Sequence, residues 1–249
     1  MKISTIFFDL GNTLLYNMHL NDESIYAACL QMARQFVSFG YPVKADTLAD
    51  RHFQILTEYY AYRANENVEY SAETVFQQTL DALGIRSVPE EHVLKTMAAF
   101  YHETQKNWLI VPGAKSLLDS LSRKKVHIGL ITNASYAEDI RQLLQQHEIR
   151  EYFDQIIISA EVGYRKPHKK IFSIALDLME SRADQSVMIG DSLVADIWGA
   201  SQSGIRSIWL KAYANVSSPL SQKIKPDAEA DSISEIPAVL QALENNSIF

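Results

Sequence analysis

Two aspartates stand where apolar stretches end, which is where an open parallel sheet gathers its functional groups, and a third lies shortly after one of them. Asp9 follows the apolar run 3–8, Asp191 follows the run 186–190, and Asp196 lies five positions beyond Asp191. Taken singly, each acid is equally consistent with a turn or a helix cap. Converging carboxylates, however, repel one another and resist ionisation unless a cation lies between them. Because carboxylate oxygens suit hard cations, the three acids together predict a Mg²⁺ site.

Two other predicted strand ends carry different polar groups. Thr132 and Asn133 close the apolar run that begins at residue 126, and Lys166 lies in the loop after the run 156–159. On their own, Thr132 and Asn133 would be helix caps and Lys166 a solvated loop residue. Because parallel strands end at one edge of a sheet, these positions should bring a hydroxyl, an amide and a cation to the three acids.

The elements that position these groups follow from the alternation of strand-like and helical segments. A first strand is predicted at 3–8, and later strands at 126–132, 156–159, 186–190 and 205–210. Helical patterns begin at Ala114 and recur at 135–147, 168–180, 192–203 and 234–244, whereas the polar stretch 214–231 is predicted to be a surface excursion. Such alternation with short connections predicts an α/β fold in which helices cover both faces of a parallel sheet.

The stretch from about residue 20 to 105 has a helical period and no strand-like pattern. Its first apolar face consists of Ile25, Ala28, Cys29, Met32 and Phe36, and further helices are predicted near 46–63, 75–83 and 93–101. We therefore expect residues 17–108 to form an all-helical unit. It would interrupt a sheet unit made of residues 1–16 and 109–249.

Composition limits the kinds of partner. The chain has 249 residues, 47% of them hydrophobic, and a formal net charge of −7, which argues against binding to nucleic acid or to an anionic membrane. There is one cysteine, Cys29, so no disulfide forms within the chain, and no apolar run is long enough for a membrane span. A cytoplasmic protein is expected, and the oligomeric state is left open.

Four segments resemble the motifs of the haloacid dehalogenase superfamily, in the order that this family has. They read "FFDLGNTL", "LITN", "VGYRKPHKKIF" and "IGDSLVADIWGA". The helical insertion after the first segment resembles the cap that this family places between its first and second motifs. The resemblance implies a Rossmann-like parallel sheet core with helices on both faces, plus an inserted all-helical cap domain.

The resemblance also implies a Mg²⁺-dependent phosphatase that acts on a small phosphorylated metabolite. Asp9 would attack phosphorus and form an aspartyl-phosphate, and Lys166 would neutralise charge on the nucleophile and the phosphate. Thr132, Asn133 and Lys166 would bind the phosphate. The metal ligands implied are Asp9, the main-chain carbonyl of Gly11, Asp191 and Asp196.

Gly11 departs from the pattern of the family's phosphatases, which commonly carry an aspartate there as general acid and base. Such a group typically contributes about 10²- to 10⁴-fold, so slow turnover or substrates with good leaving groups are expected. Tyr16 and His19 follow in the same loop, and either could replace the missing acid. Two alternatives stay open: a 2-haloacid dehalogenase-type hydrolase, which needs neither acid nor metal, and a phosphate-binding protein with little activity.

Aromatic and basic side chains in the helical unit and near Lys166 have two interpretations. Packing is favoured over contact with a sugar or base for the group Tyr59, Tyr60, Tyr62, Arg63 and Tyr70. Arg165 and Lys169 flank Lys166, where they would raise the local positive potential or simply be solvated. The identity of the substrate is not predicted.

Overall fold

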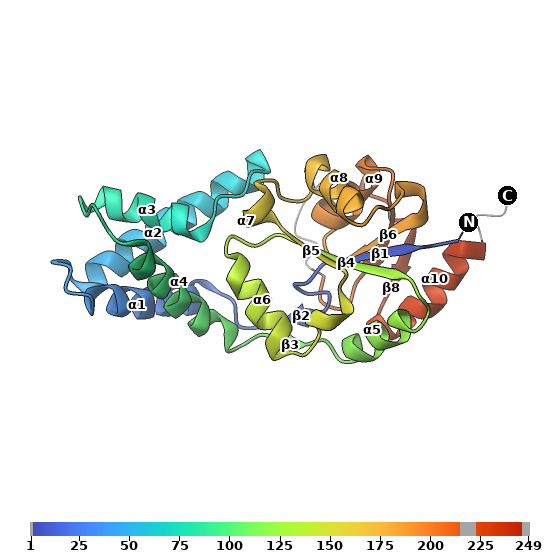
Figure 1. Cartoon of the computed structure of the whole chain (residues 1–249), viewed down its shortest axis with the longest axis horizontal. Helices are drawn as coiled ribbons and strands as arrows, with labels where there is room; N and C mark the ends of the chain where they lie inside the picture. The colour runs from blue at the N-terminus through green and yellow to red at the C-terminus, as the bar shows by residue number, and fades with distance from the viewer. Residues whose placement is uncertain (1, 215–222, 246–249) are drawn as a thin grey trace.

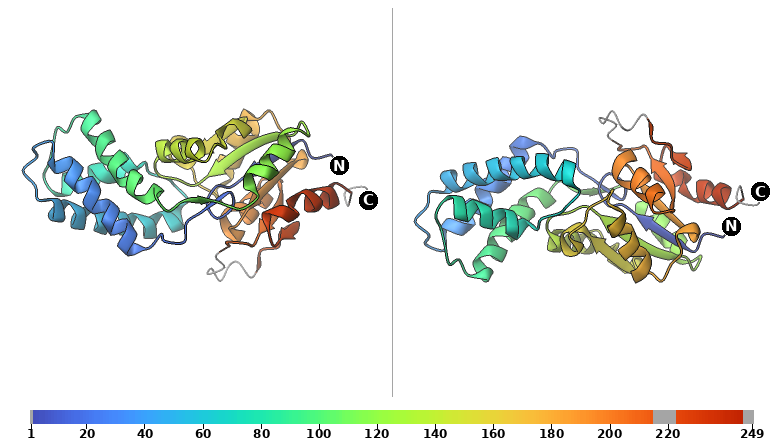
Figure 2. Two further views of the ribbon diagram at one scale, coloured as in Figure 1. Left: turned by 90° about the horizontal axis from the view of Figure 1, so that it is seen from below. Right: turned by 90° about the horizontal axis from the view of Figure 1, so that it is seen from above.

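The computed structural model describes residues 2–214 and 223–245 and has two parts (Figure 1). Four helices form a bundle at one end, and a sheet with its covering helices forms the other. Views from below and from above show the same separation (Figure 2). Within the described residues, no helix has the length and apolarity needed to cross a membrane.

The sheet has six parallel strands in the order β5-β4-β1-β6-β7-β8. Its strands are β1 (Thr5–Phe8), β4 (His127–Thr132), β5 (Gln155–Ile158), β6 (Ser186–Gly190), β7 (Arg206–Leu210) and β8 (Ala228–Ala230). Every residue of β1 is buried, as expected of a central strand covered on both faces. Phe8, at its end, is level with Leu130 of β4 and Ile189 of β6, so the three strands end within two residues of one another.

Helices cover both faces of this sheet, which confirms the predicted fold class. One face packs against α5 (Ala114–Ser122), α6 (Ala137–Gln146) and α10 (Ile236–Asn245), and the other against α8 (Lys169–Leu178) and α9 (Gly199–Gln202). A short helix, α7 (Ser159–Val162), follows β5 directly. Single 3₁₀ turns occupy Arg150–Tyr152, Ala183–Gln185 and Ile233–Glu235.

The helical unit contains α1 (Asp22–Val37), α2 (Ala45–Glu66), α3 (Ala72–Ala82) and α4 (Glu90–Gln105). Helix α1 starts with a reciprocal capping box between Asn21 and Ser24, which satisfies N–H groups that would otherwise lack partners. The predicted apolar face of α1 is buried in the core of the bundle, with Phe36 stacked on Tyr41.

A two-stranded ribbon joins the two parts. Strand β2 (Leu15–Tyr16) pairs antiparallel with β3 (Leu109–Ile110), so the outgoing and returning chains lie side by side. The sequence did not predict this ribbon, because two residues are too few to show a period. The pairing supports our proposal that residues 17–108 form a cap on a core of residues 1–16 and 109–249.

Two details of the sequence prediction are corrected by the structure. The polar stretch 214–231 is not a surface excursion throughout, because Ala228–Ala230 form the edge strand β8, with Ala230 buried. Residues 215–222 of that stretch lie outside the described residues. The segment 192–203 is not one α-helix: a π-helical turn, Leu193–Trp198, precedes α9.

Candidate active site

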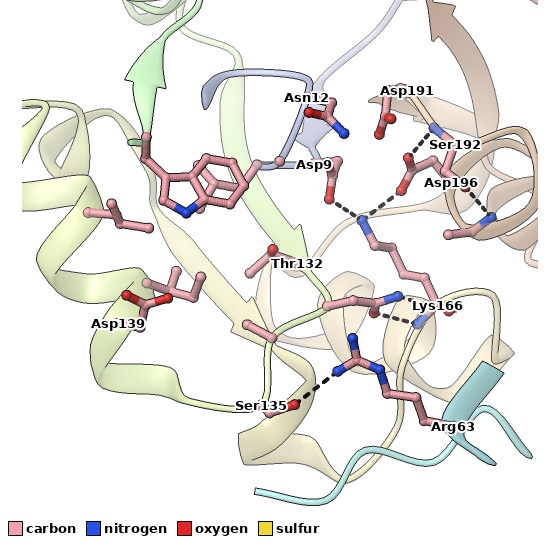
Figure 3. Close-up of a pocket in the computed structure, with 18 of the residues that line it drawn as sticks. Asp9, Asn12, Arg63, Thr132, Ser135, Asp139, Lys166, Asp191, Ser192 and Asp196 are labelled. Carbon is pink, nitrogen blue, oxygen red and sulfur yellow. Dashed lines mark hydrogen bonds and ion pairs between the residues drawn. The ribbon is translucent and has the colours of Figure 1, made fainter. Parts of the chain in front are cut away.

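All the residues that the sequence singled out as site residues line one pocket of about 330 Å³. The adjacent ends of β4, β1 and β6 carry Thr132, Asp9 and Asp191, and the loop between α7 and α8 supplies Lys166 (Figure 3). The complete set is Asp9, Gly11, Thr132, Asn133, Lys166, Asp191 and Asp196. The predicted convergence at one edge of the sheet is therefore observed.

Three carboxylates form the upper part of this pocket in Figure 3. Asp9, Asp191 and Asp196 each offer one oxygen, and these oxygens lie within 4.8 Å of one another. Burial, together with the charges of Asp9 and Asp196, raises the pKa of Asp191 to about 8. Crowded, buried oxygen donors whose charge the protein does not fully compensate fit a hard divalent cation such as Mg²⁺.

Lys166 is the cation of the site. Its side chain is buried, and Nζ lies 2.6 Å from both Asp9 Oδ1 and Asp196 Oδ1 while also donating to the carbonyl of Ile131 at 2.7 Å. Burial opposes its charge, but the carboxylates of Asp196 and Asp9 outweigh this effect and raise its pKa. Burial raises the pKa of Asp9 to about 6, although Lys166 lowers it. The lysine thus directly counters charge on the predicted nucleophile.

The close approach of Asp196 depends on Gly190. A Cβ at position 190 would overlap the carboxyl group of Asp196, so only glycine fits at the end of β6. Ser192 caps the π-helical turn through its side chain, and its N–H donates to Asp196 Oδ2 at 3.0 Å. These contacts explain why Gly190 comes before Asp191 and why Ser192 follows it.

Asn133 holds the loop that carries Lys166. Its amide nitrogen donates to the carbonyl of Lys166 at 3.0 Å, and its amide oxygen accepts from the Lys166 N–H at 2.8 Å. Both ends of the side-chain amide are therefore occupied by the main chain of Lys166. This pairing fixes the lysine, and a direct contact of Asn133 with phosphate stays a prediction.

Known proteins with similar sequences identify the family of this chain. The family model described as haloacid dehalogenase-like hydrolase matches residues 44–210. This chain belongs to that family. It is 30% identical to the glyceraldehyde 3-phosphate phosphatase of Pyrococcus furiosus, over 99% of this chain and 95% of the relative. It is also 30% identical to the pyrimidine 5'-nucleotidase YjjG of Escherichia coli, over 86% of this chain and 88% of the relative.

Among solved structures, the chain resembles that of the HAD hydrolase YfnB of Bacillus subtilis bound to magnesium. The TM-score is 0.61 with 20% identity, over 96% of this chain and 99% of the other. This similarity shows the fold alone. Together with the sequence relatives, it confirms the resemblance to the haloacid dehalogenase superfamily and to its phosphatase-like branch, and with it the prediction of a hydrolase.

Gly11 of this hydrolase lies against an aromatic ring. A Cβ at position 11 would be 3.4 Å from Cη2 of Trp108, which lines the same pocket. The indole, from the chain that returns from the helical unit, thus borders the space that a side chain at position 11 would enter. Trp108 was not predicted, because nothing local in the sequence links it to residue 11.

The two residues considered as replacements for the missing acid do not line the pocket. Tyr16 stacks on Tyr213 with ring centroids 4.5 Å apart. His19 is exposed, and its N–H donates to the side chain of Asn17. Neither contact is with a described residue of the pocket, so the structure gives no support to either as the acid.

The walls of the pocket contain residues that the sequence did not single out, and others that it assigned to packing. Asp139 on α6 accepts from Gln105 of α4 at 2.7 Å, and burial raises its pKa to about 7. Tyr60 and Arg63 of α2 line the pocket, whereas the packing predicted for Tyr59, Tyr62 and Tyr70 agrees with their stacked rings. Arg165 is not simply solvated, because it pairs with the buried carboxylate of Glu69 at 3.5 Å.

Proposed function

We propose that this protein is a Mg²⁺-dependent phosphatase that hydrolyses a small phosphorylated metabolite through an aspartyl-phosphate on Asp9. The observation that carries the proposal is the buried Lys166 ammonium held 2.6 Å from Asp9, beside a triad of carboxylates. Relatives of similar length named as phosphatases and a nucleotidase support the reaction class. Cys29 is buried and unpaired, and thiols remain reduced in the cytosol, so we place the protein in the cytoplasm.

In the first step, an oxygen of Asp9 forms a bond to phosphorus, and the bond from phosphorus to the leaving oxygen breaks. Lys166 offsets charge on Asp9 and on the phosphoryl oxygens, while the Thr132 hydroxyl donates to one of these oxygens. In the second step, a water oxygen forms a bond to phosphorus and loses a proton to solvent, and the bond from phosphorus to the Asp9 oxygen breaks. Inorganic phosphate is released and the Asp9 carboxylate is restored.

The residues that would hold Mg²⁺ are the carboxylates of Asp9, Asp191 and Asp196 and the main-chain carbonyl of Gly11. Bound there, the ion would stabilise the negative charge of the transferring phosphoryl group. The clustered carboxylates favour this metal-dependent reaction over dehalogenation, because dehalogenation needs no metal and would not use the three carboxylates as ligands.

Gly11 determines which substrates suit the site. Without a carboxylic acid two positions after Asp9, the leaving oxygen receives no proton from that position. Substrates whose leaving groups need little protonation, such as sugar 1-phosphates or acyl phosphates, are therefore favoured. Other phosphomonoesters would be hydrolysed slowly.

Phosphate release from a panel of metabolites, with and without Mg²⁺, tests the proposal. We expect Mg²⁺-dependent release by the wild type, and a loss of at least about 10³-fold in Asp9→Asn, because the amide is a poor nucleophile. Asp184→Asn is the matched control, since the Asp184 side chain is 46% exposed and pairs only with Arg182 among the described residues.

Acid quenching during turnover provides a second readout, because phosphate on the peptide that contains Asp9 marks the covalent intermediate. Full activity in Asp9→Asn, or a rate of phosphate release that does not depend on Mg²⁺, would contradict the mechanism. Halide release from 2-haloacids without Mg²⁺ would support the dehalogenase alternative, and phosphate binding without turnover would support a binding protein.

A further inference from the structure

Arg63 is the basic side chain that α2 of the helical unit contributes to the pocket. It lines the same cavity as Asp9 and Lys166, and in Figure 3 it lies on the opposite side of the pocket from the three metal-site carboxylates. Its side chain is 24% exposed, which leaves part of the guanidinium accessible from the cavity. It is therefore placed to touch the part of a substrate that extends away from the reacting phosphate.

The orientation of the guanidinium is fixed. Its carbon lies 4.0 Å from the ring centroid of Tyr60, and Nη1 donates to Ser135 Oγ at 3.1 Å. A guanidinium has five N–H donors in a planar fork. Among the described residues, only Nη1 has hydrogen-bond partners, so Nε and Nη2 are available to a ligand.

The charge of Arg63 is only partly compensated. The nearest carboxylate is that of Glu69, 3.5 Å from Arg63 Nη1, and Arg165 Nη1 lies at the same distance from the other oxygen of Glu69. Two guanidinium groups thus share one carboxylate, and one positive charge remains at the wall of the pocket.

Glu69 also accepts hydrogen bonds from three hydroxyl groups. Its oxygens accept from the hydroxyls of Tyr59 at 2.6 Å, Ser135 at 2.8 Å and Ser159 at 2.9 Å. These bonds are much shorter than its contacts with the arginines, so the carboxylate is held mainly by hydroxyl groups. A positive charge left over at a partly buried wall is stabilised by an anion from outside the protein.

We infer that Arg63 binds a second anionic group of the substrate, a carboxylate or a phosphate, at the end remote from the phosphate that is hydrolysed. Such a group would accept two charge-assisted hydrogen bonds from the planar fork. The cavity of about 330 Å³ favours a compact metabolite. This inference rests on the proposed phosphatase function and narrows its substrates to small phosphomonoesters that carry a second anionic group at the end remote from the phosphate that is hydrolysed.

Matched pairs of phosphomonoesters test the inference with the full-length protein and Mg²⁺. Glycerol 3-phosphate and 3-phosphoglycerate differ by one carboxylate, and fructose 1-phosphate and fructose 1,6-bisphosphate differ by a second phosphate. We expect Arg63→Gln to lower kcat/KM about 10- to 100-fold for the member of each pair that has the second anionic group, and less than about 3-fold for the other member. A selective loss in the first pair would identify the second anionic group as a carboxylate, and a selective loss in the second pair would identify it as a phosphate.

Two further variants serve as controls. Arg51→Gln, on the same helix but paired with Gln54 outside the pocket, should leave every kcat/KM unchanged. Arg63→Lys keeps the charge and loses the fork, so it should retain more of the preference than Arg63→Gln. Equal losses for both members of each pair would indicate a structural role alone and overturn the inference.

The outcomes separate the inference from the proposed function. If the wild type releases phosphate but Arg63→Gln shows no selective loss in either pair, the inference fails and the phosphatase function stands. If the wild type releases no phosphate from any member of the wider panel, the proposed function fails and the inference with it.

Discussion

At the scale of single residues, the sequence predicted the pocket side chains that follow strands. It did not predict the pocket side chains that other parts of the chain contribute. Asp9, Asp191 and Lys166 were found because buried strands followed by polar residues are visible locally. Arg63, which the sequence assigned to packing, reaches the pocket from the helical unit, and Trp108, which was not predicted, reaches it from the chain that returns from that unit. Their positions in the pocket depend on how the helical unit packs on the sheet core, and this packing cannot be predicted from local sequence patterns.

The glycine at position 11 leads to a prediction about proton transfer. The backbone at Gly11 is not in the left-handed region, and a Cβ there meets only Trp108, in ordinary van der Waals contact. An aspartate can therefore be introduced with modest displacement of the indole. We expect Gly11→Asp to raise kcat on substrates with poor leaving groups by about tenfold or more, and much less on acyl phosphates.

The matched control is Gly11→Asn, which has nearly the same size but cannot donate an acidic proton. Rates measured for both variants over a series of leaving groups of graded pKa separate proton transfer from crowding. An equal response of the two variants, or no dependence on the leaving group, would contradict this account of Gly11.

At the scale of elements, prediction succeeded where an apolar segment was clearly bounded by turn residues. Strand β6 was predicted with its exact bounds, because Ser186–Gly190 is buried throughout and flanked by turns. The edge strand β8 was missed because Ala-Glu-Ala lacks β-branched residues, and the π-helical turn was missed because its apolar pattern resembles that of an α-helix. Both depend on tertiary contacts that override local preference.

The contact between α4 and α6 leads to a prediction about pH. Asp139 of α6 accepts from Gln105 of α4, and burial raises its pKa from 3.8 to about 7. The folded state therefore favours the protonated acid, and stability is lost as pH rises between these two values. We expect the free energy of unfolding of the wild type, relative to Asp139→Asn, to fall by roughly 2–4 kcal/mol over this range.

Denaturant unfolding of both proteins at several pH values between 4 and 8, without Mg²⁺, measures this difference. The asparagine side chain of the variant retains an oxygen that can accept from Gln105, so the contact is preserved while the titrating group is removed. Contributions from Asp9 and Asp191 occur in both proteins and cancel. A difference that stays constant over the whole range would mean that Asp139 is ionised in the folded state.

At the scale of the whole molecule, residues 67–72, which lead from α2 into the first turn of α3, join the helical unit to the sheet core. The N–H of Ala72 donates to the carbonyl of Ser135 at 2.7 Å, and the N–H of Arg165 donates to the carbonyl of Asn67 at 3.2 Å. Val68 also forms a bridge with Tyr164. The loop that carries Lys166 is thus bound to the helical unit, which couples the position of the unit to the site.

Glu69 is the side chain at the centre of this junction, and its removal should weaken the whole molecule. It is fully buried and accepts from hydroxyls on both parts, while Arg63 and Arg165 rely on it as their shared counter-charge. Breaking a buried charge pair by removing one partner costs about 3–5 kcal/mol. For a chain of this length, we expect Glu69→Gln to lower Tm by roughly 6–12 °C.

Thermal unfolding of Glu69→Gln beside Glu66→Gln measures this effect. Glu66 lies three residues earlier and is exposed, so its loss should change stability by less than about 0.5 kcal/mol. Equal Tm values for the two variants would show that main-chain contacts alone hold the helical unit on the core.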